Sequence, residues 1–230
     1  MKKWEDLPEE LQLPEIKEYY DILKNKKVSR FVKRLFDIVV SLILLVVLCH
    51  VMIIIAILIQ RYSEGGVLFR QERVTTYGKI FKIHKFRTMV KDADKIGSQV
   101  TTGSDARITG IGSVLRKYRL DELPQLIDVL TGDMSFVGCR PEVVKYVNAY
   151  TNEMKATLLM PAGITSEASI RYKDEAELLD GADDVDKVYI EQILPAKMKY
   201  NLDSIRNFNI WNEFATMIRT VLAVLGKEYH

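Results

Sequence analysis

The sequence predicts a mostly helical α/β domain that is associated with a membrane. Three observations lead to this prediction. The 25 residues from Leu35 to Ile59 contain one charged residue, Asp37. Two short segments, 67–69 and 79–83, are rich in β-branched and aromatic residues and are typical of strands. Apolar residues in segment 209–226 recur at helical spacing.

Composition limits the classes of protein that fit. A chain of 230 residues is long enough for one sizeable domain with appendages. The net charge is +2 and no basic face with interleaved aromatics stands out, so the sequence predicts no nucleic-acid partner. The two cysteines fit neither a disulfide framework nor a zinc-site spacing, which favours a reducing compartment. No cleavable signal peptide is recognised, because the apolar run begins late.

We expect three parts: a polar arm at 1–30, a membrane-inserted segment at 31–60, and one domain at 61–230. The apolar residues of the arm, beginning with Trp4 and Leu7, fit either a membrane surface or packing against the domain. Between Lys24 and Arg34 there are six cations and no acid, a block that attracts anionic headgroups beside a membrane. Asp37 is expected to pair with one of the last of these cations, Lys33 or Arg34.

The apolar run is long enough to span a bilayer. A straight helix of this length would measure ~37 Å, more than the ~30 Å of a hydrocarbon core. The charge rule places its cationic N-terminal flank in the cytoplasm. A straight span would then put residues 60–230 outside, whereas a helix that breaks midway would return to the face it entered.

Two adjacent carboxylates, Asp121 and Glu122, form the centre of a densely charged stretch, 116–141. They stand just before an apolar helix that begins near Pro124, so helix capping is one interpretation. Cations lie on both sides, which instead suits a site that holds an anion, such as a phosphate, beside a metal. The flanking cations are Arg116, Lys117, Arg119 and, nineteen residues after Asp121, Arg140.

The remaining segments supply other expected elements. Residues 91–107 are polar and rich in Gly, Ser and Thr, which predicts a mobile loop near the site. A helix is expected from about Glu142 to Leu159. The acidic row Asp183, Asp184 and Asp186 is interpreted as a solvated helix start and not as a metal cluster. The amphipathic helix 209–226 fits either the core or a membrane interface.

Several motifs occur in a consistent order over residues 30–225, and together they resemble the bacterial sugar transferases known as monotopic phosphoglycosyl transferases. The matching segments are Lys33–Asp37 (KRLFD), Lys85–Met89 (KFRTM), Leu120–Leu126 (LDELPQL), Gly132–Gly138 (GDMSFVG), Arg140–Pro141 and Pro161–Thr165 (PAGIT).

This resemblance implies a membrane topology. Members of the family carry a re-entrant helix-break-helix, a catalytic domain on the cytoplasmic face of the bacterial inner membrane, and interfacial amphipathic helices. The break is usually a Ser-Pro pair, and this chain has Cys49 and His50 near that place. At such a break His50 would bond a freed backbone carbonyl, or it would simply pack as an uncharged side chain.

The resemblance also implies a reaction. A UDP-sugar would donate its sugar phosphate to polyprenyl (undecaprenyl) phosphate, releasing UMP and starting a lipid-linked glycan that downstream glycosyltransferases extend. Asp121 would be the nucleophile of a covalent intermediate and Glu122 a ligand of Mg²⁺. Beside so many cations we expect Asp121 to stay ionised. Phosphate-binding roles would fall to Arg116, Arg140, Lys85, Arg87 and a basic residue of the later loop, Arg171 or Lys173.

Two other classes remain open on the sequence. One is a catalytically degenerate membrane scaffold of a glycan assembly complex, which the altered Cys49-His50 and the altered loop at Ser166-Glu167 allow. The other is a bitopic binding protein that uses the apolar run only as an anchor. The intact Asp121, Glu122 and Arg140 favour the enzyme.

Overall fold

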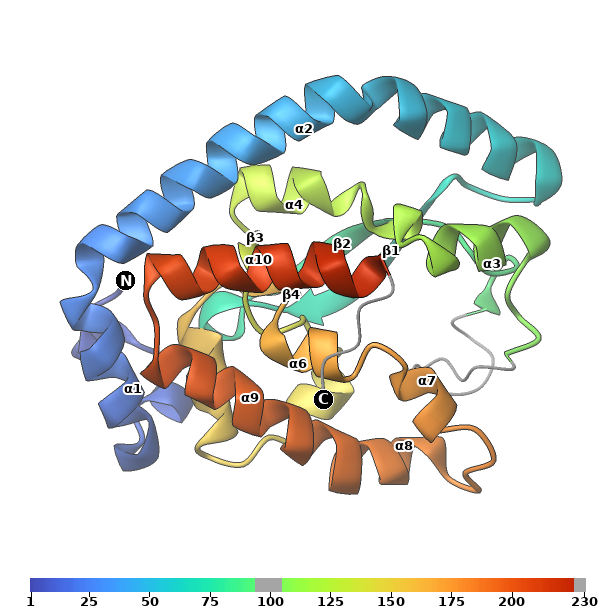
Figure 1. Ribbon diagram of the computed structural model, residues 1–230. Helices are drawn as coiled ribbons and strands as arrows, with labels where there is room; N and C mark the ends of the chain where they lie inside the picture. The colour runs from blue at the N-terminus through green and yellow to red at the C-terminus, as the bar shows by residue number, and fades with distance from the viewer. Residues whose placement is uncertain (94–104, 226–230) are drawn as a thin grey trace.

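The fold is a helical domain beneath one long, arched helix. The computed structural model describes residues 1–93 and 105–225, and Figure 1 shows the long helix, α2, passing over the strands and over α4. The predicted loop 91–107 lies mostly outside the described residues.

The elements are mostly helical, as predicted. The N-terminal half contains η1 (Trp4–Asp6), η2 (Glu9–Leu11), α1 (Pro14–Asn25), α2 (Lys27–Tyr62), β1 (Leu68–Val74), η3 (Thr76–Gly78), β2 (Ile80–Phe86) and α3 (Gly110–Lys117). The middle contains η5 (Leu120–Glu122), α4 (Gln125–Thr131), β3 (Met134–Val137), α5 (Val144–Val147), η6 (Met154–Leu159) and β4 (Ala162–Thr165). The last part contains α6 (Glu167–Arg171), α7 (Glu175–Leu178), α8 (Val185–Val188), a π-helical turn η7 (Tyr189–Ile193), α9 (Leu194–Arg206) and α10 (Ile210–Val224).

The N-terminal arm packs on the domain. Ile16, Tyr19 and Leu23 on α1 are buried against apolar residues of η6 and α9. Leu7 and Leu11, for which the sequence left two interpretations open, are buried in the same cluster, so they pack against the domain.

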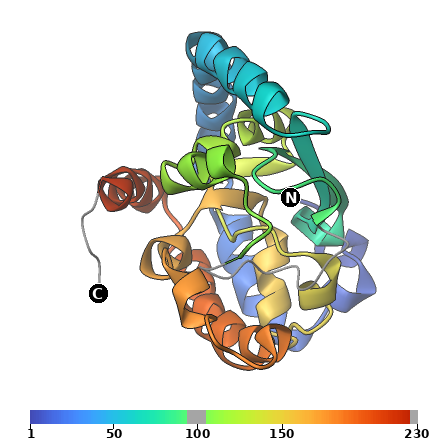
Figure 2. The same cartoon turned by 90° about the vertical axis from the view of Figure 1, so that its right-hand side faces the viewer.

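Helix α2 is continuous, so the predicted break at Cys49 and His50 was wrong. The chain has no proline there to remove a backbone donor, and the helix runs unbroken through both residues. The Nδ1 atom of His50 lies 3.4 Å from the Cys49 sulfur, and its side chain is exposed. The helix still changes direction by bending: in Figure 1 its first half rises away from the domain and its second half descends toward it. Figure 2 shows its crest projecting beyond the rest of the fold.

The first half of α2 is fastened by its polar residues. Lys33 donates to the carbonyl of Val137 at the end of β3 (2.8 Å) and forms an ion pair with Glu213 on α10. Arg34 donates to the carbonyls of Val129 and Leu130, at 2.6 and 2.9 Å, near the end of α4.

Asp37 does not pair with Lys33 or Arg34, so that prediction was wrong. Its carboxylate accepts hydrogen bonds from the Ser135 hydroxyl (2.8 Å) and the Phe136 amide (3.2 Å) on β3. These contacts satisfy a buried carboxylate where the helix meets the domain.

Two small sheets build the interior. Strands β1 and β2 lie where two short strands were predicted, and they pair antiparallel with Leu68 opposite Phe86. Strands β3 and β4 run parallel, with Met134 opposite Ala162. A Cβ atom added at Gly163 would lie 2.2 Å from the backbone nitrogen of Gly138. The two glycine-containing motifs at 132–138 and 161–165 therefore meet, and their glycines permit the close approach.

Two further predictions have different outcomes. The helix expected over 142–159 is divided into α5 and η6, with turns between them. The acidic row does begin a helix: the Asp184 carboxylate caps α8 by accepting from the Lys187 amide at 3.0 Å. No group of three or more metal-ligating side chains occurs among the described residues.

Candidate active site

The two carboxylates lie on η5, which leucines hold beneath the second half of α2. Arg119 has a φ of 56°, and this left-handed residue turns the chain between α3 and η5. Leu120 and Leu123 then pack against a buried cluster that includes Ile55 and Ile59 of α2. The polar residues between the leucines are thereby fixed next to the point where α2 meets the domain.

Glu122 is the anchored member of the pair. It is 9% exposed, and its Oε1 atom lies 2.5 Å from a terminal guanidinium nitrogen of Arg140 and 3.0 Å from the Lys85 ammonium. Burial alone would raise the pKa of Glu122, but Arg140 and Lys85 hold it well below its usual range. Glu122 in turn raises the pKa of Arg140. Glu122 is therefore a fixed anion between two cations.

Asp121 is the unanchored member. It is 8% exposed, and its buried Oδ1 atom accepts no hydrogen bond from the described residues. Burial raises the pKa of Asp121, and the negative Glu122 raises it further. Nearby cations, of which Lys85 has the largest effect, oppose this rise without cancelling it. The sequence analysis considered only the cations around Asp121, and desolvation and the adjacent carboxylate are the two effects it omitted. That Asp121 stays ionised remains a prediction.

Lys85 and Arg116 lie beside the carboxylate pair, and their role toward phosphate stays a prediction. Burial lowers the pKa of Lys85 to about 8, although Glu122 favours its charged form. Arg116 is held by a 2.9 Å hydrogen bond from its Nε atom to the Thr88 hydroxyl. Burial also lowers the pKa of Arg116, and Asp121 partly offsets that effect.

The other predicted basic residues have different partners. Two nitrogens of Arg87 donate to the carbonyls of Ser63 (2.7 Å) and Glu64, just after α2. Arg171 pairs with Glu167 at 3.2 Å and lies over the Tyr200 ring. The described contacts therefore give Arg87 a role in holding the chain after α2, and its role toward phosphate stays a prediction.

Lys173 belongs to a loop that reaches η5. Its carbonyl accepts from Arg119 at 3.3 Å, while its ammonium lies 3.8 Å from Asp174. The loop is thus attached to the residue just before the carboxylate pair, although these contacts do not bring the Lys173 ammonium to the carboxylates.

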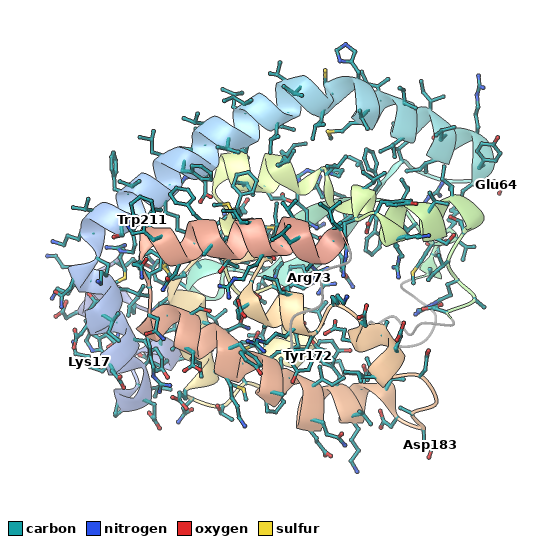
Figure 3. All side chains as sticks on the ribbon, viewed as in Figure 1. Lys17, Glu64, Arg73, Tyr172, Asp183 and Trp211 are labelled. Atoms are coloured by element: carbon teal, nitrogen blue, oxygen red, sulfur yellow. The ribbon has the colours of Figure 1, made fainter. Side chains whose placement is uncertain are left out.

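Sequence reasoning missed Arg73. It donates to the carbonyl of Pro141 at 3.0 Å and to Gln71 at 2.6 Å, so it fixes the turn that carries Arg140. Figure 3 shows it near the centre of the molecule in that view. On β1 it stands opposite Phe81, and no motif in the sequence marked it.

A second missed feature is a buried ionic network behind Arg140. The Lys197 ammonium donates to Glu175 at 2.8 Å and to the Tyr189 hydroxyl at 3.1 Å. The Tyr189 hydroxyl donates to Glu142 at 2.6 Å. These residues come from separate helices and loops, and their spacing in the sequence gives no signal.

Comparisons with known proteins show which family the chain belongs to. The chain matches the family model described as bacterial sugar transferase over residues 28–227. It belongs to the bacterial sugar transferase family.

Several relatives of known name are similar to this chain, and their names describe sugar-phosphate transfer to undecaprenyl phosphate. The chain is 32% identical over 198 residues to an Aeromonas hydrophila UDP-N-acetylgalactosamine-undecaprenyl-phosphate N-acetylgalactosaminephosphotransferase, an alignment that covers 85% of this chain and 44% of the relative. It is 35% identical over 199 residues to an Escherichia coli K12 UDP-glucose:undecaprenyl-phosphate glucose-1-phosphate transferase, covering 84% and 40%. The chain therefore spans less than half the length of these relatives.

A third relative has a similar length. It is a Bacillus subtilis protein provisionally named an undecaprenyl-phosphate N-acetylgalactosaminyl 1-phosphate transferase. The identity is 36% over 165 residues, covering 70% of this chain and 90% of that protein.

Proposed function

We propose that this protein transfers a sugar phosphate from a UDP-sugar to undecaprenyl phosphate through a covalent intermediate on Asp121. The observation that carries the proposal is the contrast within the carboxylate pair. Glu122 is held by Arg140 and Lys85, whereas a buried oxygen of Asp121 accepts no hydrogen bond from the described residues. An oxygen without a donor is available to form a bond.

The reaction has two displacement steps at one phosphorus. In the first, an Asp121 oxygen attacks the phosphorus that bears the sugar, and the bond from that phosphorus to the bridging oxygen breaks. The bridging oxygen leaves with UMP. In the second, an oxygen of undecaprenyl phosphate attacks the same phosphorus, the bond to Asp121 breaks, and the carboxylate is restored. Dividing the transfer in this way avoids bringing two anionic substrates together in a single step.

The surrounding cations reduce the repulsion between Asp121 and the phosphates. Arg140 and Arg116 are suited to phosphate oxygens, because guanidinium groups form charge-assisted and bidentate bonds. Lys85 contributes a buried positive charge at the same place. The Glu122 carboxylate keeps both Arg140 and Lys85 in position before substrate binds.

Mg²⁺ fits this donor set. Mg²⁺ is usually held by one or two carboxylates together with substrate phosphates and water. The described residues provide such a pair in Glu122 and Asp121, and they contain no larger cluster of metal-ligating side chains. Glu122 would hold the ion, which when bound would neutralise charge on the phosphate oxygens.

The test of the proposed function is UMP release by the purified protein in a lipid environment. We expect release from at least one UDP-sugar when undecaprenyl phosphate is present. With labelled donor and no acceptor, the label should stay on the peptide that contains residue 121. Turnover without such an adduct would contradict the covalent route, and no turnover with any UDP-sugar would favour a scaffold.

Membrane attachment through a helix that enters and leaves on one face is part of the proposal. Helix α2 is the one helix among the described residues that is long and apolar enough to cross a membrane, and an 18-residue stretch within it has a mean hydropathy of 3.4. Lys33 near its start and Ile59 near its end both contact the same domain. A spanning helix would have to separate these ends by a bilayer.

The proposed orientation places the domain on the cytoplasmic face of the inner membrane, where UDP-sugars occur. Helix α10 would lie at the interface, because Trp211, Ile218 and Leu225 present apolar surface to solvent. The product would begin a lipid-linked glycan that other glycosyltransferases extend.

Labelling from one side tests the topology. In a variant with Cys49 and Cys139 replaced by alanine, we introduce Lys27→Cys or Glu64→Cys, both exposed positions at the ends of α2. A membrane-impermeant maleimide applied to inside-out vesicles should label both, because both ends face the cytoplasm. Labelling of one position from each side would establish a span instead.

A further inference from the structure

A cavity of about 350 Å³ lies away from the carboxylate pair. Its walls come from the ends of β3 and β4, from η6, and from the facing sides of α9 and α10. The carboxyl ends of parallel strands are frequent binding places in α/β proteins. The volume is large enough for a small ligand, and neither the proposed reaction nor the family comparison gives it a role.

The walls contain polar atoms that need a partner. Seven buried side-chain atoms in the described residues lack a hydrogen bond, and three of them belong to residues lining this cavity. They are Oδ1 of Asn201, Nε of Arg219 and Oε2 of Glu167, and the last of these is already in an ion pair with Arg219. Asn201 is 5% exposed, so its free carbonyl oxygen is isolated from bulk water. Buried polar groups are nearly always satisfied, so both a donor and an acceptor are expected from an occupant.

The charge of the walls decides the class of that occupant. Three acids, Glu167, Asp203 and Glu213, line the cavity against one cation, Arg219. Arg219 is already 3.1 Å from Glu167. Such walls disfavour a phosphate. They suit a neutral ligand rich in hydroxyl groups, because carboxylates and amides accept from hydroxyls and guanidinium nitrogens donate to them.

A planar base is a poorer fit. Two aromatic rings line the cavity, Tyr200 on α9 and Phe208 just after that helix. Phe208 is 3% exposed and packs in the buried cluster that includes α1, and the Arg171 guanidinium lies 5.0 Å from the centre of the Tyr200 ring. Tyr172 packs edge-on against the same ring. A nucleobase would therefore find no free aromatic face on Tyr200 to stack on.

We infer that this cavity binds a neutral, hydroxyl-rich sugar ring, held by Asn201 and Arg219. The sugar comes either from the UDP-sugar donor, in which case the inference rests on the proposed function, or from a separate saccharide. The cavity and the carboxylate pair share one turn. Cys139 lines the cavity and accepts a bond from the Asn201 amide at 3.2 Å, and the next residue, Arg140, reaches Glu122.

Replacing Asn201 with leucine tests the site in the full-length protein. The substitution keeps the approximate shape and removes the amide. If the donor's sugar occupies the cavity, KM for the UDP-sugar rises about tenfold, the effect of losing one hydrogen bond of about 1.4 kcal/mol. Inhibition by UDP, which has no sugar on its diphosphate, should change less than twofold. A general folding defect would change both values together.

A second measurement covers the separate saccharide. Binding of methyl glycosides to the wild-type protein is followed by saturation-transfer NMR. If a separate saccharide occupies the cavity, this binding is lost in Asn201→Leu while KM for the donor is unchanged. Asn148→Leu, at an exposed position outside the cavity, is the matched control and should behave as wild type.

The outcomes separate the two proposals. If Asn201→Leu does not fold, Thr216→Val serves instead, since Thr216 lines the cavity and the change is nearly isosteric. Equal changes in KM and in UDP inhibition, or no change in either measurement, would overturn the sugar site while UMP release still supports the proposed function. Glycoside binding without any UMP release would support the cavity and contradict the proposed function.

Discussion

Asp121→Asn is expected to lower UMP release by at least about 10³-fold, the scale of losing a nucleophile. The amide keeps the size of the carboxylate but cannot form the acyl phosphate that the proposed route needs. Folding should survive. Burial and Glu122 raise the pKa of Asp121, so its ionised form is disfavoured in the folded protein, and removing the charge does not weaken the fold.

Two quantities are measured for Asp121→Asn: the rate of UMP release and the thermal unfolding midpoint. Single-turnover release of UMP gives the chemical step, and the thermal unfolding midpoint in detergent should stay within a few degrees of wild type. Asp183→Asn is a matched control, because Asp183 is exposed just before α8 and lies outside both the carboxylate pair and the cavity. Wild-type rates in Asp121→Asn would refute its assignment as the nucleophile.

The sequence predicted those helices and strands that are determined by a pattern within a single short segment. The β-branched and aromatic residues of 67–69 and 79–83 predicted the strands β1 and β2, and the acidic row predicted the start of α8. The apolar run gave α2 and the helical spacing of 209–226 gave α10. Each of these depends on periodicity or on capping within one segment.

Other features depended on contacts between distant segments. Nothing within 132–138 indicates that it pairs with 162–165, because parallel strands are brought together by packing over the whole intervening chain. Asp37 was expected to pair with neighbouring cations. Its carboxylate instead accepts a hydrogen bond from Ser135 on β3, almost 100 residues later in the sequence. The bend of α2 needs no Ser-Pro pair, since both halves of the helix are held on the domain.

The site shows the same division. The motif resemblance identified Asp121, Glu122, Lys85 and Arg140, and the structure brings all four into one cluster. What the motif did not give is the unequal environment of the two carboxylates. That difference arises because both cations contact Glu122, while the Asp121 oxygen is left without a donor.

This unequal environment leads to the second large prediction. Glu122→Gln is expected to destabilise the protein by about 3 kcal/mol, since it leaves two cations, Lys85 and Arg140, without their buried counter-charge. The expected value is at the lower end of the range for breaking a buried ion pair, because the Arg140 side chain is 28% exposed to solvent. The unfolding midpoint should fall by roughly 6–12 °C for a domain of this size.

The comparison with Asp121→Asn makes the result specific. The two variants change adjacent residues in the same chemical way, from carboxylate to amide, and both positions are buried to a similar degree. Glu122 forms the ion pairs with Lys85 and Arg140, so only Glu122→Gln should have a lowered thermal unfolding midpoint. A double variant, Glu122→Gln with Lys85→Met, should recover part of the loss, because it removes one of the two unpaired charges. Equal melting of the two single variants would mean that the carboxylates share the cations, and the division into an anchored Glu122 and a reactive Asp121 would fail.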